Sequence, residues 1–414
     1  MNFCRILILH TLVAMLLVET ANAQPIVETG GKQMPDEWID AHTGHRVIRL
    51  TKPIGNNSSF YFHNRPFIGN SMVYYHSEIK AQQDSAFGVA MSNPSNKQLY
   101  LLNLQSRIAE PLTNHPVAMS GEIVFDKGAD VYFQSNDSVY SVNARTRKTK
   151  LIFVFPADFK ASITCVNADG TLLGGAKASE VEKEILKQNP GKSSYFNLIY
   201  EAHLPRTLFT IDIKSGKLEK LFTDSAWLNH VQFSSTDPHL MMFCHEGPWH
   251  KVNRIWTINV KTKKIEQIHH RVMEMEIAGH EWNSVDGKTI WYDLQQPKGE
   301  VFFLEGHELA TKKKTKYSLT RDEWSIHFNS NSTDDLFCGD GGDSSQVAKA
   351  TNGQWIYLFK PKEGRLVSEK LVDMKHHQYK LEPNVHFSPD EKWVIFRANF
   401  EGSTQVYAVE IEKH

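Results

Sequence analysis

Three side chains able to bind a metal ion lie close together near the end of the chain. The segment Leu381–Asp390 reads L-E-P-N-V-H-F-S-P-D, with Glu382, Asn384 and His386 at alternate positions. In an extended segment, alternate side chains share one face. Carboxylate and amide oxygens suit hard cations, and imidazole suits transition metals. The spacing therefore predicts a polar cluster of three potential ligands on one face, directly beside a turn.

The end of the same segment is a turn signal that recurs along the chain. Phe-Ser-Pro-Asp at 387–390 precedes a run of strand-forming residues, Trp393–Phe396. Degraded copies of the turn, each before another strand-like run, begin at Phe67, Ile123, Val166, Phe233, Asn283 and Ser330. About seven units at a period of roughly 45 to 65 residues are typical of a β-propeller. We expect an all-β fold, a seven-bladed β-propeller, in one domain over residues 24–414.

Two distant strands are expected to close this ring, and one helix interrupts it. The early strand 46–50 (Arg-Val-Ile-Arg-Leu) could pair with the last strand, 405–411, which would remove the sheet edges. A polar helix is expected over Ser179–Gln188, because Ser179 and Glu182 have the spacing of a capping box. This helix fits an excursion over one face, and a solvated element without a functional role is the favoured interpretation.

The first residues have the pattern of an export signal. Arg5 supplies a positive start, Ile6–Val18 is apolar but too short to remain as a membrane span, and Ala21–Ala23 forms a cleavage motif. The mature chain is expected to begin at Gln24 and to be periplasmic or secreted, without membrane insertion after signal removal. The net charge of −1 gives no general attraction to nucleic acid.

Several functional classes lack their motifs in this sequence. It contains no G-x-S-x-G elbow, no phosphate-binding P-loop and no H-E-x-x-H zinc motif. Three cysteines remain after the signal, an odd and scattered set that does not form a disulfide framework. They are expected to be small buried residues: Cys165, Cys244 and Cys338.

Histidines occupy equivalent positions in the later units. Three residues before the turn, these units carry His230, His280, His327 and Asn384, and the early units carry Asn64, Ser120 and Ile163. In a propeller such positions surround the central channel, so three imidazoles and an amide would converge there. A single histidine is usually structural, but three at one structural position indicate a functional cluster.

Two further features lie near this expected ring. The segment Cys244–His250 reads C-H-E-G-P-W-H, and it brings His245, Trp249 and His250 into one turn. These side chains could contact a sugar ring, or the tryptophan could simply pack in a hairpin. Arg206 could be an exposed strand residue, or it could bind a carboxylate with both arms of its guanidinium.

Four segments together resemble a known family. C-H-E-G-P-W-H, G-H-E-W-N-S-V-D-G, I-H-F-N-S-N and E-P-N-V-H-F-S-P-D occur in this order between Arg206 and the C-terminus. They are similar to the oligogalacturonate lyases of polysaccharide lyase family 22. The resemblance implies a seven-bladed propeller that cleaves short oligogalacturonates by β-elimination, with Mn²⁺ on the substrate carboxylate.

The resemblance also implies roles for individual residues. His230 matches the proton-abstracting histidine of the family, Arg206 its substrate-binding arginine, and His280 one metal-binding histidine. The other family ligands form a Q-x-x-H-x-H pattern, and the corresponding positions here are Tyr379, Glu382 and Asn384. His386, two residues further on, could replace a lost imidazole. The expected metal ligands are thus His280, Glu382, Asn384 and His386, with Mn²⁺ as the expected ion and Ca²⁺ as the alternative.

The chemistry expected of this site is β-elimination on a uronate. A cation on the carboxylate would stabilise the charge that develops when C5 loses its proton, and Arg206 would add a second positive contact. His230 would take that proton. The substrate, a uronic-acid oligosaccharide such as a pectin fragment, would be contacted by His245, Trp249, His250 and His327, the last of which could instead complete the metal shell. The alternatives are a lyase for another uronate linkage, such as rhamnose–glucuronate or an algal polysaccharide, and a non-enzymatic periplasmic scaffold.

Overall fold

The chain folds almost entirely into β-strands. The structure, a computed structural model, describes residues 24–78 and 97–413, so the predicted signal at 1–23 lies outside the described residues. The described part contains many short strands and two α-helices, which confirms the all-β prediction. Cys165, Cys244 and Cys338 are free and buried, as expected.

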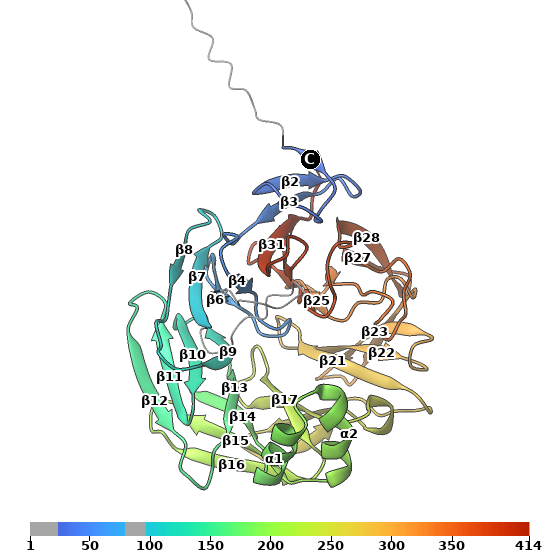
Figure 1. Cartoon of the computed structure of the whole chain (residues 1–414). Coiled ribbons are helices and arrows are strands. Elements are labelled where there is room, and N and C mark those ends of the chain that lie inside the picture. The colour runs from blue at the N-terminus through green and yellow to red at the C-terminus, as the bar shows by residue number, and fades with distance from the viewer. Residues whose placement is uncertain (1–23, 79–96, 414) are drawn as a thin grey trace, which may run out of the picture.

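Successive strands form sheets that follow one another around a common centre (Figure 1). The first of these sheets contains β4 (Asn56–Ser58), β5 (Phe67–Ile68), β6 (Ser71–Ser77), β7 (Gln98–Asn103) and β8 (Ala109–Pro111). The second contains β9 (Ser120–Phe125), β10 (Asp130–Ser135), β11 (Ser138–Asn143) and β12 (Thr149–Val154). The third contains β13 (Ser162–Val166), β14 (Leu172–Lys177), β15 (Arg206–Asp212) and β16 (Leu218–Asp224).

The later sheets continue this antiparallel pattern. The fourth contains β17 (Leu228–Phe233), β18 (Leu240–His245), β19 (Ile255–Asn259) and β20 (Ile265–Gln267). An eight-stranded sheet follows, in which β21 (Ile277–Asn283), β22 (Thr289–Gln295), β23 (Phe302–Glu308) and β24 (Lys314–Leu319) form one half. The other half consists of β25 (Phe328–Ser330), β26 (Phe337–Gly339), β27 (Trp355–Lys362) and β28 (Arg365–Asp373). Only one parallel pair, Ser318 with Arg365, joins the two halves.

Apolar side chains from neighbouring sheets pack together and hold the ring. Ile123 and Tyr132 of the second sheet share a buried cluster with Phe209 of the third. Leu208, on the other face of the third sheet, packs with Val231 and the rest of a cluster centred on the fourth sheet. Inner strands are covered on both faces, which explains their nearly continuous apolar sequences.

The last sheet joins the two ends of the described chain. It contains β1 (Ile26–Val27), β2 (Glu37–Asp40), β3 (Arg46–Arg49), β31 (Gln405–Glu410), β30 (Trp393–Ala398) and β29 (His386–Phe387). Val47 pairs with Val409 in antiparallel register, which confirms the predicted closure. Across this joint Arg49 contacts the buried carboxylate of Glu401 at 2.8 Å, and the Tyr407 hydroxyl donates to the same carboxylate at 2.6 Å.

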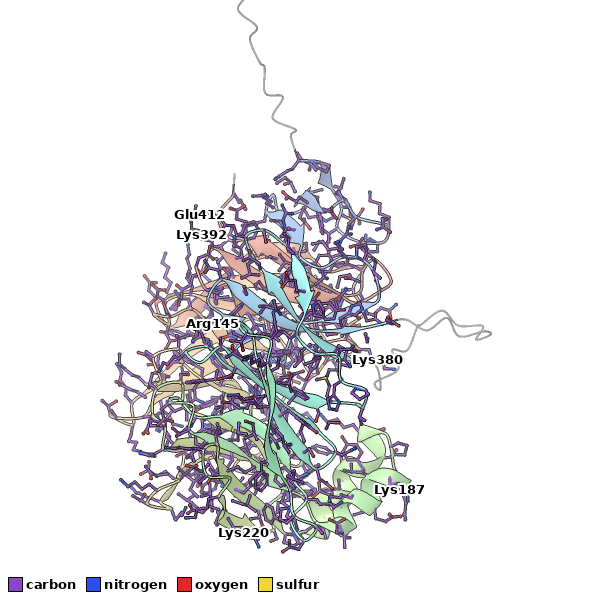
Figure 2. The ribbon with its side chains drawn as sticks, turned by 90° about the vertical axis from the view of Figure 1, so that its left-hand side faces the viewer. Arg145, Lys187, Lys220, Lys380, Lys392 and Glu412 are labelled. Atoms are coloured by element: carbon purple, nitrogen blue, oxygen red, sulfur yellow. The ribbon has the colours of Figure 1, made fainter. Side chains whose placement is uncertain are left out.

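Two helices interrupt the third sheet between β14 and β15. They are α1 (Glu180–Gln188) and α2 (Lys192–Ala202), and they project from one side of the molecule in the edge-on view of Figure 2. The capping prediction is confirmed, because the hydroxyl of Ser179 accepts from the backbone N–H of Glu182 at 3.1 Å. Neither these helices nor any other in the described ranges is long and apolar enough to span a membrane.

The ion pair at the closure predicts unequal effects of two similar substitutions in β3. Arg49→Met would leave the Glu401 carboxylate, 3% exposed, without its cation, and should lower the free energy of unfolding by about 3–5 kcal/mol. Arg46→Met removes a more exposed contact to Glu37 and should cost about 1 kcal/mol or less. Urea unfolding of both variants measures the difference. Equal losses in the free energy of unfolding would contradict the idea that the buried pair stabilises the ring closure.

Candidate active site

Two histidines stand at bulges where the innermost strands change register. The pairing of β17 with β18 shifts between Asn229 and Gln232, and that of β21 with β22 shifts between Gly279 and Trp282. His230 and His280 lie within these bulges with left-handed φ angles of 45° and 47°. Such a backbone is uncommon for residues other than glycine and is often found at functional sites. The bulges turn both imidazoles away from the regular alternation of the strand.

His230, His280 and His327 each have an acidic partner that lies on, or directly after, the next strand of the same sheet. His280 Nδ1 lies 2.9 Å from Asp293 Oδ1, and His327 Nδ1 lies 2.8 Å from Asp340 Oδ2. His230 Nε2 lies 3.2 Å from Glu246 Oε2. A carboxylate fixes both the orientation and the tautomer of the imidazole that it contacts. The same arrangement therefore occurs three times around the centre.

The partner of His230 is itself held in the charged state. Burial alone would raise the pKa of Glu246, but Arg254 and His230 keep that pKa well below its usual value. Arg254 donates to Glu246 at 2.9 Å and to Glu281 at 2.9 Å. Because a carboxylate only accepts, Nε2 of His230 must carry the proton that faces Glu246. Nδ1 is then the nitrogen with a free lone pair.

An aromatic segment between β4 and β5 lies between the histidines. The ring of Tyr61 is 5.0 Å from that of His327 and 6.3 Å from that of His230, and its hydroxyl lies 3.3 Å from His327 Nε2. Phe62 stacks on His327 at 4.6 Å, and the rings of His280 and His327 are 4.9 Å apart. The imidazoles thus belong to one cluster, as the sequence predicted.

A donor set for a cation forms at one side of this cluster. The Nδ1 atoms of His280 and His327 are engaged by carboxylates, so Nε2 is in each case the nitrogen that could bind an ion, although that of His327 now faces the Tyr61 hydroxyl. Glu382 Oε2 lies 3.8 Å from His327 Nε2. Two imidazoles and a carboxylate suit a first-row transition metal. His280, His327 and Glu382 are therefore the residues that could hold the ion.

Asn384 does not join this donor set, and the reason lies in its backbone. Its φ is 54°, and residues 381–385 are not in a strand, so alternate side chains do not share a face there. The amide Oδ1 accepts from the N–H of Phe62 at 2.9 Å, and Nδ2 donates to the carbonyl of Glu382 at 2.9 Å. The expectation that Glu382, Asn384 and His386 would converge on one face is therefore wrong.

His386 lies apart from the histidine pair. Its Nε2 contacts the carbonyl of Asn64 at 3.2 Å, and burial lowers the pKa of this imidazole to about 4. It lines a cavity of about 610 Å³ together with the turns that end the inner strands, including Phe233, Asn283, Ser330 and Phe387. The residues three positions before these four turns, His230, His280, His327 and Asn384, do not line this cavity. Figure 2 agrees with two separate faces, because Lys392, after the last turn, lies opposite Lys187 of α1 and Lys380.

Arg206 binds a carboxylate with both arms, but that carboxylate belongs to the protein. Its Nε donates to Glu182 of α1 at 2.8 Å and its Nη2 to the other oxygen of Glu182, while Nη1 donates to the carbonyl of Leu228 at 2.8 Å. Helix α1 is thus tied to the strand that carries His230. Arg206, Asn229 and Val231 line a second cavity of about 760 Å³.

The side chains expected to contact sugar are dispersed. His245 stacks on Trp256 with ring centres 4.8 Å apart. Trp249 packs against His280 at 4.9 Å and donates to Glu246 at 2.9 Å. His250 lies in the short 3₁₀ turn η2 (Trp249–Lys251). Of the three, only Trp249 contacts the imidazole cluster, through its ring contact with His280. The roles of all three residues in substrate binding stay predictions.

One trio of potential ligands has closer atoms than the others. Within the described ranges, His230, Cys244 and Glu246 are the His, Cys or acidic residues whose ligand atoms all lie within 4.8 Å of one another. Burial raises the pKa of the Cys244 thiol well above its usual value. The guanidinium of Arg254 also sits on Glu246. A neutral thiol and an adjacent cation disfavour a metal ion there, so this trio supports His230 instead.

The sequence reasoning missed the acidic partners and Tyr61. Asp293 and Asp340 each follow their histidine by thirteen residues, and this repeated spacing is a signal that could have identified them. Glu246 lies in the segment Cys244–His250, for which the sequence-based prediction concerns only His245, Trp249 and His250. Tyr61 lies in a weakly patterned early unit and carried no comparable signal.

Comparisons with known proteins identify a family and a type of fold. The family model described as oligogalacturonate lyase matches residues 30–414. An oligogalacturonide lyase of Pectobacterium atrosepticum is 24% identical over 90% of this chain and 95% of its own length. A solved oligogalacturonate lyase in complex with manganese has a TM-score of 0.75 at 22% identity, covering 93% of this chain and 98% of its own. The Swd1 β-propeller domain from Myceliophteria thermophila has a TM-score of 0.52 at 10% identity, covering 88% and 99%.

These matches settle the family and the type of fold. The family model spans nearly the whole chain, and the structural likeness extends to β-propeller proteins. The segments that suggested the resemblance carry Glu246, His280 and His327, which the fold brings to its centre together with His230. The chain belongs to the oligogalacturonate lyase family, a family of polysaccharide lyases.

Proposed function

We propose that this protein cleaves short oligogalacturonates by metal-assisted β-elimination and produces an unsaturated uronate. The observation that carries the proposal is the set of three histidine–carboxylate pairs around one centre. Two of these pairs orient imidazoles for an ion, and the third orients an imidazole with a free Nδ1. Family membership supports the same activity.

His230 is suited to remove the C5 proton of the substrate. Its side chain is 29% exposed, against 0% for His327, so it is the imidazole that a sugar can reach most readily. With Nε2 held by Glu246, Nδ1 accepts the proton, and the imidazolium that forms is stabilised by the Glu246 carboxylate. The electron pair left on C5 forms the double bond with C4 as the glycosidic oxygen departs.

A divalent cation, manganese by analogy with the solved relative, would be held by His280, His327 and Glu382. Bound there, it would neutralise the charge that builds on the substrate carboxylate as C5 is deprotonated. Asp293 and Asp340 keep the two imidazoles oriented, which is the usual arrangement behind metal-binding histidines. Asn384 and His386 are left out of this set because their polar atoms are turned elsewhere.

We further propose a seven-bladed ring in a single domain over residues 24–414. Four four-stranded or five-stranded sheets, the two halves of the eight-stranded sheet and the closing sheet then count as one blade each. The single bridge between β24 and β28 supports treating the halves as separate blades. Export to the periplasm or beyond is proposed from the signal pattern at 1–23.

The proposed base predicts a selective loss of turnover. His230→Ala should lower kcat by about 10²- to 10⁴-fold while bound manganese is unchanged, because His230 is not in the proposed ion site. Ultraviolet absorbance of the unsaturated product from digalacturonate and trigalacturonate measures the rate. His239→Ala, a matched control on an exposed histidine in the turn between β17 and β18, should stay near the wild-type rate. Substantial activity in the His230 variant would remove it from the base role.

The ion site predicts which histidines retain the metal. His280→Ala and His327→Ala should lose most bound manganese after dialysis, whereas His386→Ala should retain it. Asp293→Asn should weaken manganese binding by about 10- to 100-fold, because the His280 ring loses its fixed orientation. Elemental analysis and a manganese titration measure both effects. Loss of metal in the His386 variant with retention in the His327 variant would favour the ligand set expected from the sequence.

The departure from the family ligand pattern also favours a second candidate function. Tyr379 and Asn384 stand where relatives have metal ligands. The bond that the enzyme cleaves could therefore belong to another uronate linkage, such as rhamnose–glucuronate. A substrate panel that includes such oligosaccharides separates the two: product from another uronate but none from galacturonates would keep the mechanism and change the substrate.

The export proposal predicts a defined mature terminus. Expressed with its own leader in a Gram-negative host, the protein should be recovered from the periplasm with Gln24 as its first residue, as read by intact mass. A chain begun at residue 24 behind an initiator methionine should remain in the cytoplasm. Full-length protein in the cytoplasm from the native leader would refute export.

A further inference from the structure

Arg397 occupies the place in the closing sheet that an acidic residue occupies in the units of His280 and His327. It follows Asn384 by thirteen residues, the spacing that separates His280 from Asp293 and His327 from Asp340. Its backbone N–H donates to the carbonyl of Pro383 at 2.9 Å, next to Asn384. In this unit the histidine has become an amide and the carboxylate has become a guanidinium. A pair that could orient a metal ligand has been replaced by one that carries a positive charge.

The guanidinium of Arg397 has no acidic partner in the described part of the chain. Its Nε donates to the carbonyl of Glu382 at 2.8 Å and its Nη1 to the carbonyl of Ser59 at 3.0 Å, while Nη2 keeps its donors free. Burial lowers the pKa of Arg397, against the raising effect of Glu122 and Glu382. A half-buried cation without a bonded anion is costly unless a ligand supplies the anion.

Arg397 also lies beside the proposed reaction centre. The carbonyl that it holds belongs to Glu382, whose carboxylate is 3.8 Å from His327 Nε2. The other arginine expected near the substrate, Arg206, already binds both oxygens of Glu182. Of these two arginines, only Arg397 retains capacity for a carboxylate, and the planar guanidinium fork matches a carboxylate in geometry.

We propose that Arg397 binds the carboxylate of the uronic-acid substrate and thereby selects acidic sugars over neutral ones. This inference deepens the proposed function and rests on it for the class of ligand. It assigns to a residue of the last unit the charge contact that the family resemblance implied for Arg206. Arg206 instead fixes α1 to the strand that carries His230.

Binding of two monosaccharides tests this assignment without requiring catalysis. Galacturonic acid has no linkage to cleave, and galactose differs from it by lacking the carboxylate. In calorimetric titrations of the manganese-loaded protein, Arg397→Met should weaken galacturonic acid binding by about 10- to 100-fold and leave galactose binding unchanged. Arg65→Met removes another arginine without a hydrogen-bonded acid, at the 610 Å³ cavity on the other face, and should change neither affinity.

The outcomes separate this inference from the proposed function. Undiminished preference for galacturonic acid in Arg397→Met overturns the inference, as does a wild type that shows no such preference or an equal loss for both sugars. If Arg397→Met does not fold, Arg397→Lys keeps the charge without the fork and should bind galacturonic acid less tightly at an unchanged melting temperature; wild-type affinity in that variant also overturns it. Arg397-dependent binding with no elimination product from any uronate would refute the proposed function alone.

Discussion

The contact between an imidazole and a carboxylate on the neighbouring strand is the interaction on which the centre of this protein depends. It requires an inner strand, a bulge or strand end that turns the histidine inward, and a second strand whose register brings an acid to the same level. His280 with Asp293 and His327 with Asp340 meet these requirements in adjacent halves of one sheet. His230 meets them through the opposite ring nitrogen, and that difference in tautomer separates a candidate base from candidate ligands.

The centre is filled by a segment that no sheet contributes. Phe62 donates its N–H to Asn384 and accepts at its carbonyl from Asn329, while the N–H of Tyr61 donates to Glu122. These three side chains come from different sheets, so one short stretch of backbone ties the inner strands together. Its aromatic rings lie against His327, with Tyr61 and Phe62 at 5.0 and 4.6 Å. The imidazole cluster thus lies apart from the cavity that His386 lines together with the structural turns.

The type of fold and the central position of the histidines could be predicted from the sequence, because similar turns recur along the chain. Counting back from the turns identified His230, His280, His327 and Asn384, and three of these four carry left-handed φ angles or bulges that confirm a shared structural position. The prediction that Glu382, Asn384 and His386 share one face was wrong for a specific reason. Side chains alternate between faces only in a regular strand, and the positive φ of Asn384 breaks that regularity. Partners across strands, such as Asp293, depend on register around a bulge, which periodicity alone does not reveal. The helix interpreted as a solvated excursion supplies the buried Glu182, because a capping residue can also face inward.

The pairing of β3 with β31 has a consequence for the order in which the protein can be built. Residues 46–49 pair with β2 on one side, but their partner on the other side is residues 405–410, and Arg49 meets the Glu401 carboxylate 352 positions away. Contacts so distant in sequence form late and slow the folding of a domain. During synthesis one hydrogen-bonding edge of β3 therefore stays unpaired until every other sheet has formed. A chain interrupted before its last strand would keep His230, Glu246 and the two ligand histidines, yet would display an unsatisfied edge at each end, which is the form of a β-protein most prone to pair with its own copies.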